Sequence, residues 1–259
     1  MQKKFTILSV ICFSLIIVGT SYAATYSYSV PFFTSKSGYW TGLAINNLST
    51  TNTATVTAKV YGYEGSLLAT ETRLLNAKGQ DSFCVGAGLN KEGWVLVESD
   101  QPLGGLAFVG DVTRGNLIYD ISLISCLSTT LSVPHVAQNQ NWDTWIIICN
   151  PNDQTLTAIL SFYGKDGSLA STSSVLISAK GSDVFTMEDF VTHTVKEGSL
   201  TIDTTSSGTD GVSAFALYTN LIKVSGGCAQ AGISAVAIPE SQGDLSPANE
   251  AIFKLSLSC

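Results

Sequence analysis

The chain has 259 residues, of which 13 are Lys or Arg and 20 are Asp or Glu, so its formal net charge is −7. Hydrophobic residues make up 45% of it and charged residues only 13%, which is typical of a chain that buries large cores. The acidic balance argues against nucleic acid or an anionic membrane surface as a partner, because both attract basic patches.

The first 23 residues have the pattern of an export signal. Lys3 and Lys4 precede an apolar stretch over residues 5–18, and Ser21-Tyr22-Ala23 is a small-x-small cleavage pattern. The stretch is shorter than the roughly 20 residues of a spanning helix, and Cys12 lies too early to carry a lipid after cleavage. We expect a periplasmic or extracellular protein without an integral membrane span. Loss of the two lysines leaves 11 basic residues against 20 acidic ones, a net charge of −9.

The rest of the chain consists of short runs rich in Thr, Val, Ile and aromatic residues, separated by turn residues. No run has the 3.6-residue period of a helix, although residues 187–194 allow one helical turn. The strands expected in the first half are 26–33, 39–46, 54–61, 67–75, 80–85, 93–98, 103–109 and 117–123. Those expected in the second half are 131–136, 142–149, 155–163, 169–177, 182–186, 199–203, 212–218 and 232–238.

One block of sequence occurs twice. Residues 61–67 read Tyr-Gly-Tyr-Glu-Gly-Ser-Leu and residues 163–169 read Tyr-Gly-Lys-Asp-Gly-Ser-Leu, and Ala-Lys-Gly, Asp and Phe follow at equal distances in both copies. Such self-similarity predicts one structural unit present twice. Within the block, an acidic residue before Gly is a tight-turn signal. We prefer this turn to a calcium loop, which needs several oxygen ligands, because the first copy offers only Glu64.

Comparison of the two copies indicates which face of each strand is buried. Alternate positions stay apolar in both copies, while their neighbours change character, as solvent-facing residues would. About eight short strands in roughly 100 residues is the rhythm of an immunoglobulin-like domain. We therefore predict an all-β protein of two tandem immunoglobulin-like antiparallel β-sandwiches, with one barrel of all the strands as the alternative. The predicted core positions are Val56, Ala58 and Val60 with Ala158, Leu160 and Phe162; Leu43 and Ile45 with Ile146 and Ile148; and Val95 and Val97 with Leu200 and Ile202.

The expected organisation is a signal at 1–23, a first sandwich at 24–126, a second at 127–239 and an extension at 240–259. The join near residues 126–130 is too short to be a free linker, so the two sandwiches should touch. In the extension, residues 251–257 have no counterpart in the first copy and would suit an extra edge strand.

Five cysteines remain after cleavage of the signal, so at least one is unpaired or pairs with another chain. They do not occupy repeated positions, since Cys84 aligns with Thr186 and Cys149 with Asn46. We expect at least one disulfide to involve the trio Cys126, Cys228 and Cys259, which fall in expected loops of opposite sandwiches and at the end of the tail. A zinc site is disfavoured by the absence of any C-x-x-C motif.

Enzymatic motifs are lacking. The sequence has no G-x-S-x-G, no H-E-x-x-H and no paired-carboxylate motif, and it has two histidines, His135 and His193. His135 lies in an expected strand at the position of Phe32, and His193 lies in a polar loop. We predict no enzyme activity, no cofactor and no metal. A hydrolase with an unrecognised site is the third hypothesis.

Aromatic residues at strand starts suggest a glycan site. Tyr39 and Trp40 begin one expected strand, and Trp142, with Trp145 three residues on, begins its counterpart. Aromatic side chains at strand ends can stack on sugar rings, although burial at the end of the sandwich is their commoner use. A carbohydrate-binding module that uses these four residues is therefore the second functional hypothesis.

Each copy also has an apolar stripe that its twin lacks. Trp94 and Leu96 face away from the predicted core of the first sandwich, and Trp145, Ile147 and Cys149 face away from that of the second. Soluble proteins seldom expose contiguous patches of this kind. The stripes should therefore cover each other or be covered by the tail; a binding face for another protein is the alternative.

The chain resembles a loosely characterised class of secreted bacterial proteins built from tandem β-sandwich repeats. The resemblance rests on Trp40-Thr41-Gly42-Leu43-Ala44 through Asn47, on Trp142 through Asn150-Pro151, and on the two Tyr-Gly-x-x-Gly-Ser-Leu hairpins. It implies architecture and no activity. A two-domain periplasmic chaperone has a similar architecture, but matching basic cleft residues are missing. The main functional hypothesis is an exported, non-enzymatic protein that recognises a protein or glycan at the cell surface, or forms part of the cell envelope.

Overall fold

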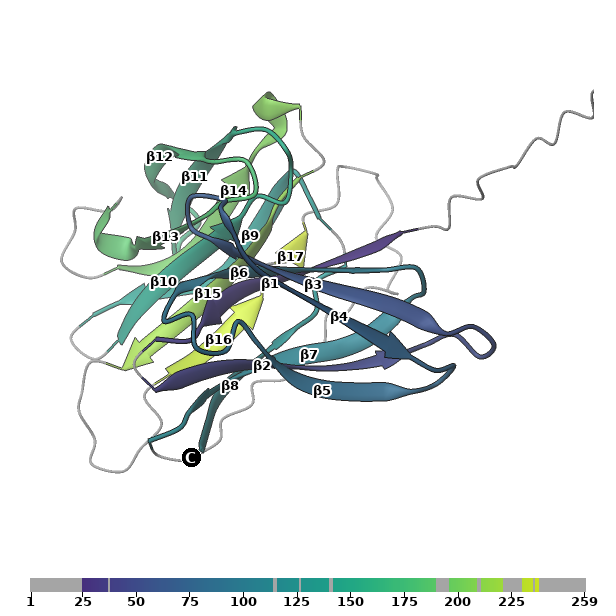
Figure 1. The fold of residues 1–259 in the computed structure, drawn as a ribbon. Helices are drawn as coiled ribbons and strands as arrows, with labels where there is room; N and C mark the ends of the chain where they lie inside the picture. The colour runs from purple at the N-terminus through teal and green to yellow at the C-terminus, as the bar shows by residue number, and fades with distance from the viewer. Residues whose placement is uncertain are drawn as a thin grey trace, which may run out of the picture.

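The structure is a computed structural model that describes residues 25–36, 38–113, 116–125, 127–139, 142–189, 196–208, 211–220, 230–234 and 236–237. The regular structure in these ranges is β-strand (Figure 1), apart from two single-turn 3-10 helices, η1 (Met187–Asp189) and η2 (Thr205–Ser207). No helix in these ranges is long and apolar enough to cross a membrane. The expected export signal, His193 and the expected strand at 251–257 lie outside the described residues.

The first half of the chain forms two four-stranded antiparallel sheets that enclose one core. Sheet 1A has the order β1-β6-β3-β4, and sheet 1B has the order β5-β2-β7-β8. The strands of sheet 1A are β1 (Tyr26–Thr34), β6 (Glu92–Ser99), β3 (Ala54–Gly62) and β4 (Leu67–Leu75). Those of sheet 1B are β5 (Gln80–Val85), β2 (Tyr39–Asn47), β7 (Leu103–Asp111) and β8 (Asn116–Ser122).

The second half repeats this strand order, with β9, β14, β11 and β12 in the places of β1, β6, β3 and β4, and adds a fifth strand, β17, to one sheet. Sheet 2A has the order β12-β11-β14-β9-β17, and sheet 2B has the order β13-β10-β15-β16. The strands of sheet 2A are β12 (Leu169–Ile177), β11 (Leu156–Gly164), β14 (Lys196–Asp203), β9 (Thr130–Gln138) and β17 (Val236–Ala237). Those of sheet 2B are β13 (Ser182–Thr186), β10 (Trp142–Cys149), β15 (Ser213–Asn220) and β16 (Gln230–Ser234).

The antiparallel sandwich architecture predicted from the sequence is confirmed, and the described strands form four open sheets rather than one barrel. The strand order within each sandwich has its own pattern. In immunoglobulin constant domains the first two strands lie side by side in one sheet. Here β1 pairs with β6 while β2 pairs with β5 and β7, so the first two strands lie in opposite sheets.

The alternating apolar positions form the two cores, as predicted. Each of the fourteen predicted core residues is at most 3% exposed. Because side chains in a strand alternate between its faces, the residues between them point outward and are more exposed. Thr57 and Lys59 of β3, for example, are both half-buried.

Each sandwich has a buried asparagine at the same position, bonded to equivalent backbone carbonyls. The Nδ2 of Asn47 donates to the carbonyls of Asn52 (2.7 Å), Leu75 and Asn76, and that of Asn150 donates to those of Gln154 (2.8 Å), Ile177 and Ser178. Buried polar groups must be hydrogen-bonded to be tolerated. Each asparagine therefore fixes the connections that converge on one end of its sandwich.

Candidate functional site

The outer face of sheet 2B covers one open edge of the first sandwich. In Figure 1 the strands of sheet 2B run between the rest of the second sandwich and the first, with β1 lying against β10 and β15, and β16 beside β8. Four outward residues of this face are at most 3% exposed and belong to the core cluster of the first sandwich: Ile147, Cys149, Phe215 and Leu217. The two sandwiches therefore share a continuous apolar interface.

Polar groups at this interface are paired across it. Ser29 and Ser213 share a 2.6 Å hydrogen bond between their hydroxyls. Nearby, the Cys149 thiol donates to the carbonyl of Pro31 over 3.1 Å. Complete burial raises the pKa of the Cys149 thiol well above its usual value, which keeps it protonated. Cys149 is thus a packing residue rather than a nucleophile.

The β3–β4 hairpin of the first sandwich adds a second contact. The backbone N–H of Ser182 donates to the carbonyl of Tyr63 (2.9 Å), and the Trp94 indole donates to the carbonyl of Lys180 (2.8 Å). At Gly65 the backbones of the two sandwiches approach so closely that a Cβ would lie 2.1 Å from the carbonyl oxygen of Ala179. The matching hairpin of the second sandwich lacks such a close contact at the equivalent glycine, since a Cβ at Gly167 would meet nothing within 4 Å.

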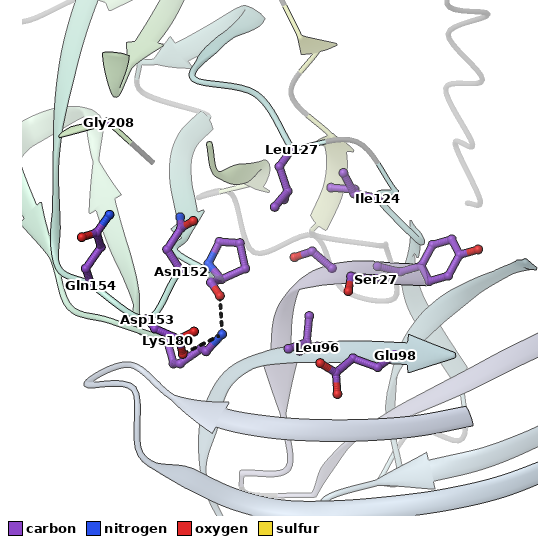
Figure 2. A pocket seen from close by; sticks show the side chains of 13 residues that line it. Ser27, Leu96, Glu98, Ile124, Leu127, Asn152, Asp153, Gln154, Lys180 and Gly208 are labelled. Atoms are coloured by element: carbon purple, nitrogen blue, oxygen red, sulfur yellow. Dashed lines mark hydrogen bonds and ion pairs between the residues drawn. The ribbon is translucent and has the colours of Figure 1, made fainter. Parts of the chain in front are cut away.

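A groove of about 510 Å³ lies between the sandwiches, beside this interface. Figure 2 shows Ser27, Leu96 and Glu98 on one side, Asp153 and Lys180 on another, and Ile124 and Leu127 on a third. Its charged groups are already satisfied. Lys180 Nζ donates to the carbonyl of Pro151 and lies 3.2 Å from Asp153, and Glu98 pairs with Lys59 at 2.6 Å. The groove therefore offers a ligand few unpaired charges.

The outer face of sheet 1B is a second candidate surface. This face is the twin of the buried outer face of sheet 2B, because the sheets have the same strand order. Its indole, Trp40, lies across two glycines of the sheet. A Cβ at Gly110 would lie 2.4 Å from the Trp40 ring, and one at Gly42 would lie 2.9 Å from it. The ring is half-buried and lies flat on the backbone.

Half-buried and polar residues share this face with Trp40. Register places Phe108 opposite Gly42 and Leu106 opposite Ala44, and all of them except the glycine are half-buried. The outermost strands contribute exposed side chains, which are Gln80, Ser82 and Cys84 of β5 and Asp120 and Ser122 of β8. Among the described outward positions of sheet 1B, Asp120 is the sole charged side chain.

The candidate surface residues of the sequence analysis fall into three places. Trp94, Leu96 and Ile147 are buried where the sandwiches meet. Trp145 is 39% exposed, and its indole donates to Asp143 Oδ2 over 3.1 Å. Tyr39 and Trp142 are exposed at the first positions of β2 and β10. The four aromatics assigned to a glycan site thus belong to sheets of different sandwiches.

His135 has charged and aromatic neighbours. It is exposed on β9, with Nε2 3.6 Å from Glu197 Oε1, while Lys165 Nζ is 2.7 Å from the other oxygen of Glu197. The hydrogen bond from Lys165 is the main reason why the pKa of Glu197 is lowered. Tyr218 donates its hydroxyl to the His135 carbonyl. This network involves no serine or cysteine nucleophile in the described contacts, so it does not form a triad.

Of the cysteines, Cys84 and Cys149 are described, and both are free thiols, one exposed and one buried. The disulfide expected among Cys126, Cys228 and Cys259 lies outside the described residues. Among the described residues, no three His, Cys, Asp or Glu side chains lie close enough together to bind a metal ion.

Sequence reasoning singled out Trp40 but missed the two glycines beneath it. Gly42 was visible as the second residue after Trp40, since alternate residues share a face of a strand. Gly110 lies 70 positions along the chain, and only the pairing of β2 with β7 brings it opposite Trp40. No family model and no curated protein sequence matches this chain.

Proposed function

We propose that the protein is an exported, non-enzymatic recognition protein of the bacterial cell envelope, and that it binds its partner through the outer face of sheet 1B. One observation carries this proposal. The twin face on sheet 2B is buried against the first sandwich, whereas the face on sheet 1B keeps half-buried Trp40, Leu106 and Phe108. Apolar side chains gathered on a free sheet face are typical of interaction sites.

The rest of the molecule supports a binding role. The apolar interface between the sandwiches holds sheet 1B on a rigid support, and a rigid surface loses little conformational entropy on binding. The groove of Figure 2 has its charges paired internally, and the His135 network lacks a nucleophile. Export is proposed from the amino-terminal pattern of charge and hydrophobicity.

The test uses purified mature protein and the isolated envelope of the bacterium that encodes it. Retention on the envelope is measured by co-sedimentation for the wild type and for Phe108→Glu, which places a charge beside Trp40. The control is Leu176→Glu, which adds the same charge on β12, where Leu176 is 71% exposed. Thermal unfolding shows that each variant is folded.

We expect the wild type and Leu176→Glu to be retained and Phe108→Glu to be released. Equal retention of all three proteins would place the binding surface elsewhere. Failure of the wild type to bind would refute the envelope role itself.

A further inference from the structure

Trp40 and its two glycines have the form of a stacking platform. In a sheet, an outward indole normally stands among neighbouring side chains, but here the positions beneath it carry none. Both glycines have ordinary negative-φ backbone, so no turn or strained conformation explains them. Their effect is to let the ring lie flat, with contacts so close that any Cβ at Gly110 would collide with it. One ring face therefore contacts the sheet and the other is available to a ligand.

The second sandwich shows that this arrangement is not a requirement of the fold. In the twin sheet, the position of Trp40 is taken by Asp143, that of Gly42 by Trp145, and that of Gly110 by Thr219. Sheet 2B forms with the same strand order without a tryptophan and two glycines at these positions. The platform is thus a feature of the first sandwich alone.

The surroundings of the platform select the chemistry of the ligand. The described outward positions of sheet 1B contain no Lys or Arg, which disfavours phosphate groups and nucleic acid as ligands. Neutral hydroxyl and amide side chains follow along the same face, away from the ring: Ser82 and Ser122 lie level with Ala44, and Asn46 and Gln80 lie at the far end of β2. A chain of pyranose rings that runs along the face matches this arrangement, because the C–H face of one ring packs on the electron-rich face of the indole while the hydroxyls of the next rings need neutral donors and acceptors.

We propose that Trp40 is the stacking residue of a glycan-binding site on the outer face of sheet 1B, held flat by Gly42 and Gly110. This inference rests on the proposed recognition function and names its ligand class, a neutral polysaccharide or oligosaccharide chain. Trp142 and Trp145 of the second sandwich take no part in it.

The direct test observes the indole N–H signals of the ¹⁵N-labelled mature protein. The chain has four tryptophans, Trp40, Trp94, Trp142 and Trp145, so Trp→Phe variants assign each signal. The probes are tetrasaccharides of β-1,4-linked glucose, β-1,4-linked N-acetylglucosamine, β-1,4-linked mannose and β-1,4-linked xylose, together with purified peptidoglycan glycan strands. We expect at least one probe to shift the Trp40 signal and to leave that of buried Trp94 unchanged.

Two variants then test the platform. Trp40→Ala should weaken the binding of that probe by about tenfold or more, as loss of a central aromatic contact does. Gly110→Ala should weaken it as well while Trp40 remains, because the added Cβ lifts the ring from the sheet. The control Gly167→Ala adds a methyl group in open space and should leave binding unchanged.

Protease treatment of the envelope separates this inference from the proposed function. Retention that survives digestion and is competed by the glycan probe supports both. Retention that disappears on digestion, with a Trp40 signal unmoved by every probe, overturns the glycan site but leaves envelope recognition through a protein partner. A Trp40 signal that no probe shifts, with retention that survives digestion, also overturns the site.

Discussion

Sheets 1B and 2B have the same strand order, but their outer faces differ in burial. On sheet 2B, Ile147 and Phe215 are at most 1% exposed beneath the first sandwich. Their twins on sheet 1B, Ala44 and Leu106, are half-buried on a face that no other described sheet covers. The two sheets have the same strand order, and their outward side chains differ. On sheet 2B the outward residues are large and apolar and form an interface with the first sandwich.

The corresponding strands β1 and β9 also differ in burial. In β1, Pro31 and Phe32 are buried against the second sandwich, whereas the matching Pro134 and His135 of β9 are exposed. The corresponding strands also have different neighbours, because β1 ends sheet 1A whereas β9 lies between β14 and β17 in sheet 2A.

The largest expected effect separates the twin positions Phe215 and Leu106. Phe215→Ala removes a fully buried ring from the interface and should lower the free energy of unfolding by about 3–5 kcal/mol. Leu106→Ala removes a half-buried side chain and should lower it by only about 1 kcal/mol. Urea denaturation of the mature protein measures both. Equal losses would mean that the two faces are packed alike.

The two hairpins provide the next comparison. Gly65 and Gly167 both have positive φ, +89° and +79°, so alanine is strained at either position. Gly167→Ala should destabilise the protein by about 1–2 kcal/mol from this strain alone. Gly65→Ala should destabilise it further, by roughly 1–3 kcal/mol, because its Cβ would overlap the Ala179 carbonyl across the interface. If Gly167→Ala has the larger effect, the hairpin contact is absent in solution.

A smaller effect concerns pH. In the first sandwich Arg73 Nε lies 3.4 Å from Asp81, but its counterpart beside Asp183 is Val175. Burial raises the pKa of Asp183, and nearby Asp189 adds to the shift. The folded state thus binds this proton more tightly than the unfolded state, so the stability it contributes is present at low pH and is lost as pH rises through the raised pKa.

Asp183→Asn removes that loss. From about pH 4, the usual carboxyl range, to pH 7, its unfolding free energy should fall less than that of the wild type. The raised pKa of Asp143 gives a further slope of the same sign, which this variant retains. Asp81→Asn is the control and should lower stability by at most about 1 kcal/mol, because it removes an exposed ion pair. A steeper pH dependence in Asp183→Asn would contradict the assignment.

The smallest expected effect is at Trp145. This indole is 39% exposed beside the buried Ile147, and its N–H bonds a neighbouring carboxylate. Trp145→Ser should therefore lower the free energy of unfolding by only about 1 kcal/mol. Trp94→Phe removes the hydrogen bond from the indole to the Lys180 carbonyl. It should lower the free energy of unfolding by at least as much, because the loss of this hydrogen bond alone costs about 1 kcal/mol. Calorimetric melting of the two variants gives their order. A melting temperature reduced more by Trp145→Ser would place Trp145 inside the interface.

Local pattern was sufficient to predict the strands and the core. Alternating apolar residues and tight-turn glycines gave the observed bounds of strands such as β4, β5, β10 and β12. The strand order could not be predicted, because β1 pairs with β6 between residues 58 to 73 positions apart and no local sequence feature indicates this pairing. The same limit applies to the candidate site. Trp40 was identifiable in the sequence, but the role of Gly110 depends on the β2–β7 register.

The proposed function requires that the outer face of sheet 1B, and not the twin face of sheet 2B, binds the envelope. The decisive measurement is retention on the isolated envelope for the matched pair Trp40→Ala and Trp145→Ala, whose residues lie on corresponding faces of sheets 1B and 2B. We predict that Trp40→Ala is released and Trp145→Ala is retained as the wild type is. Release of Trp145→Ala with retention of Trp40→Ala would place the recognition surface on the second sandwich and contradict the account.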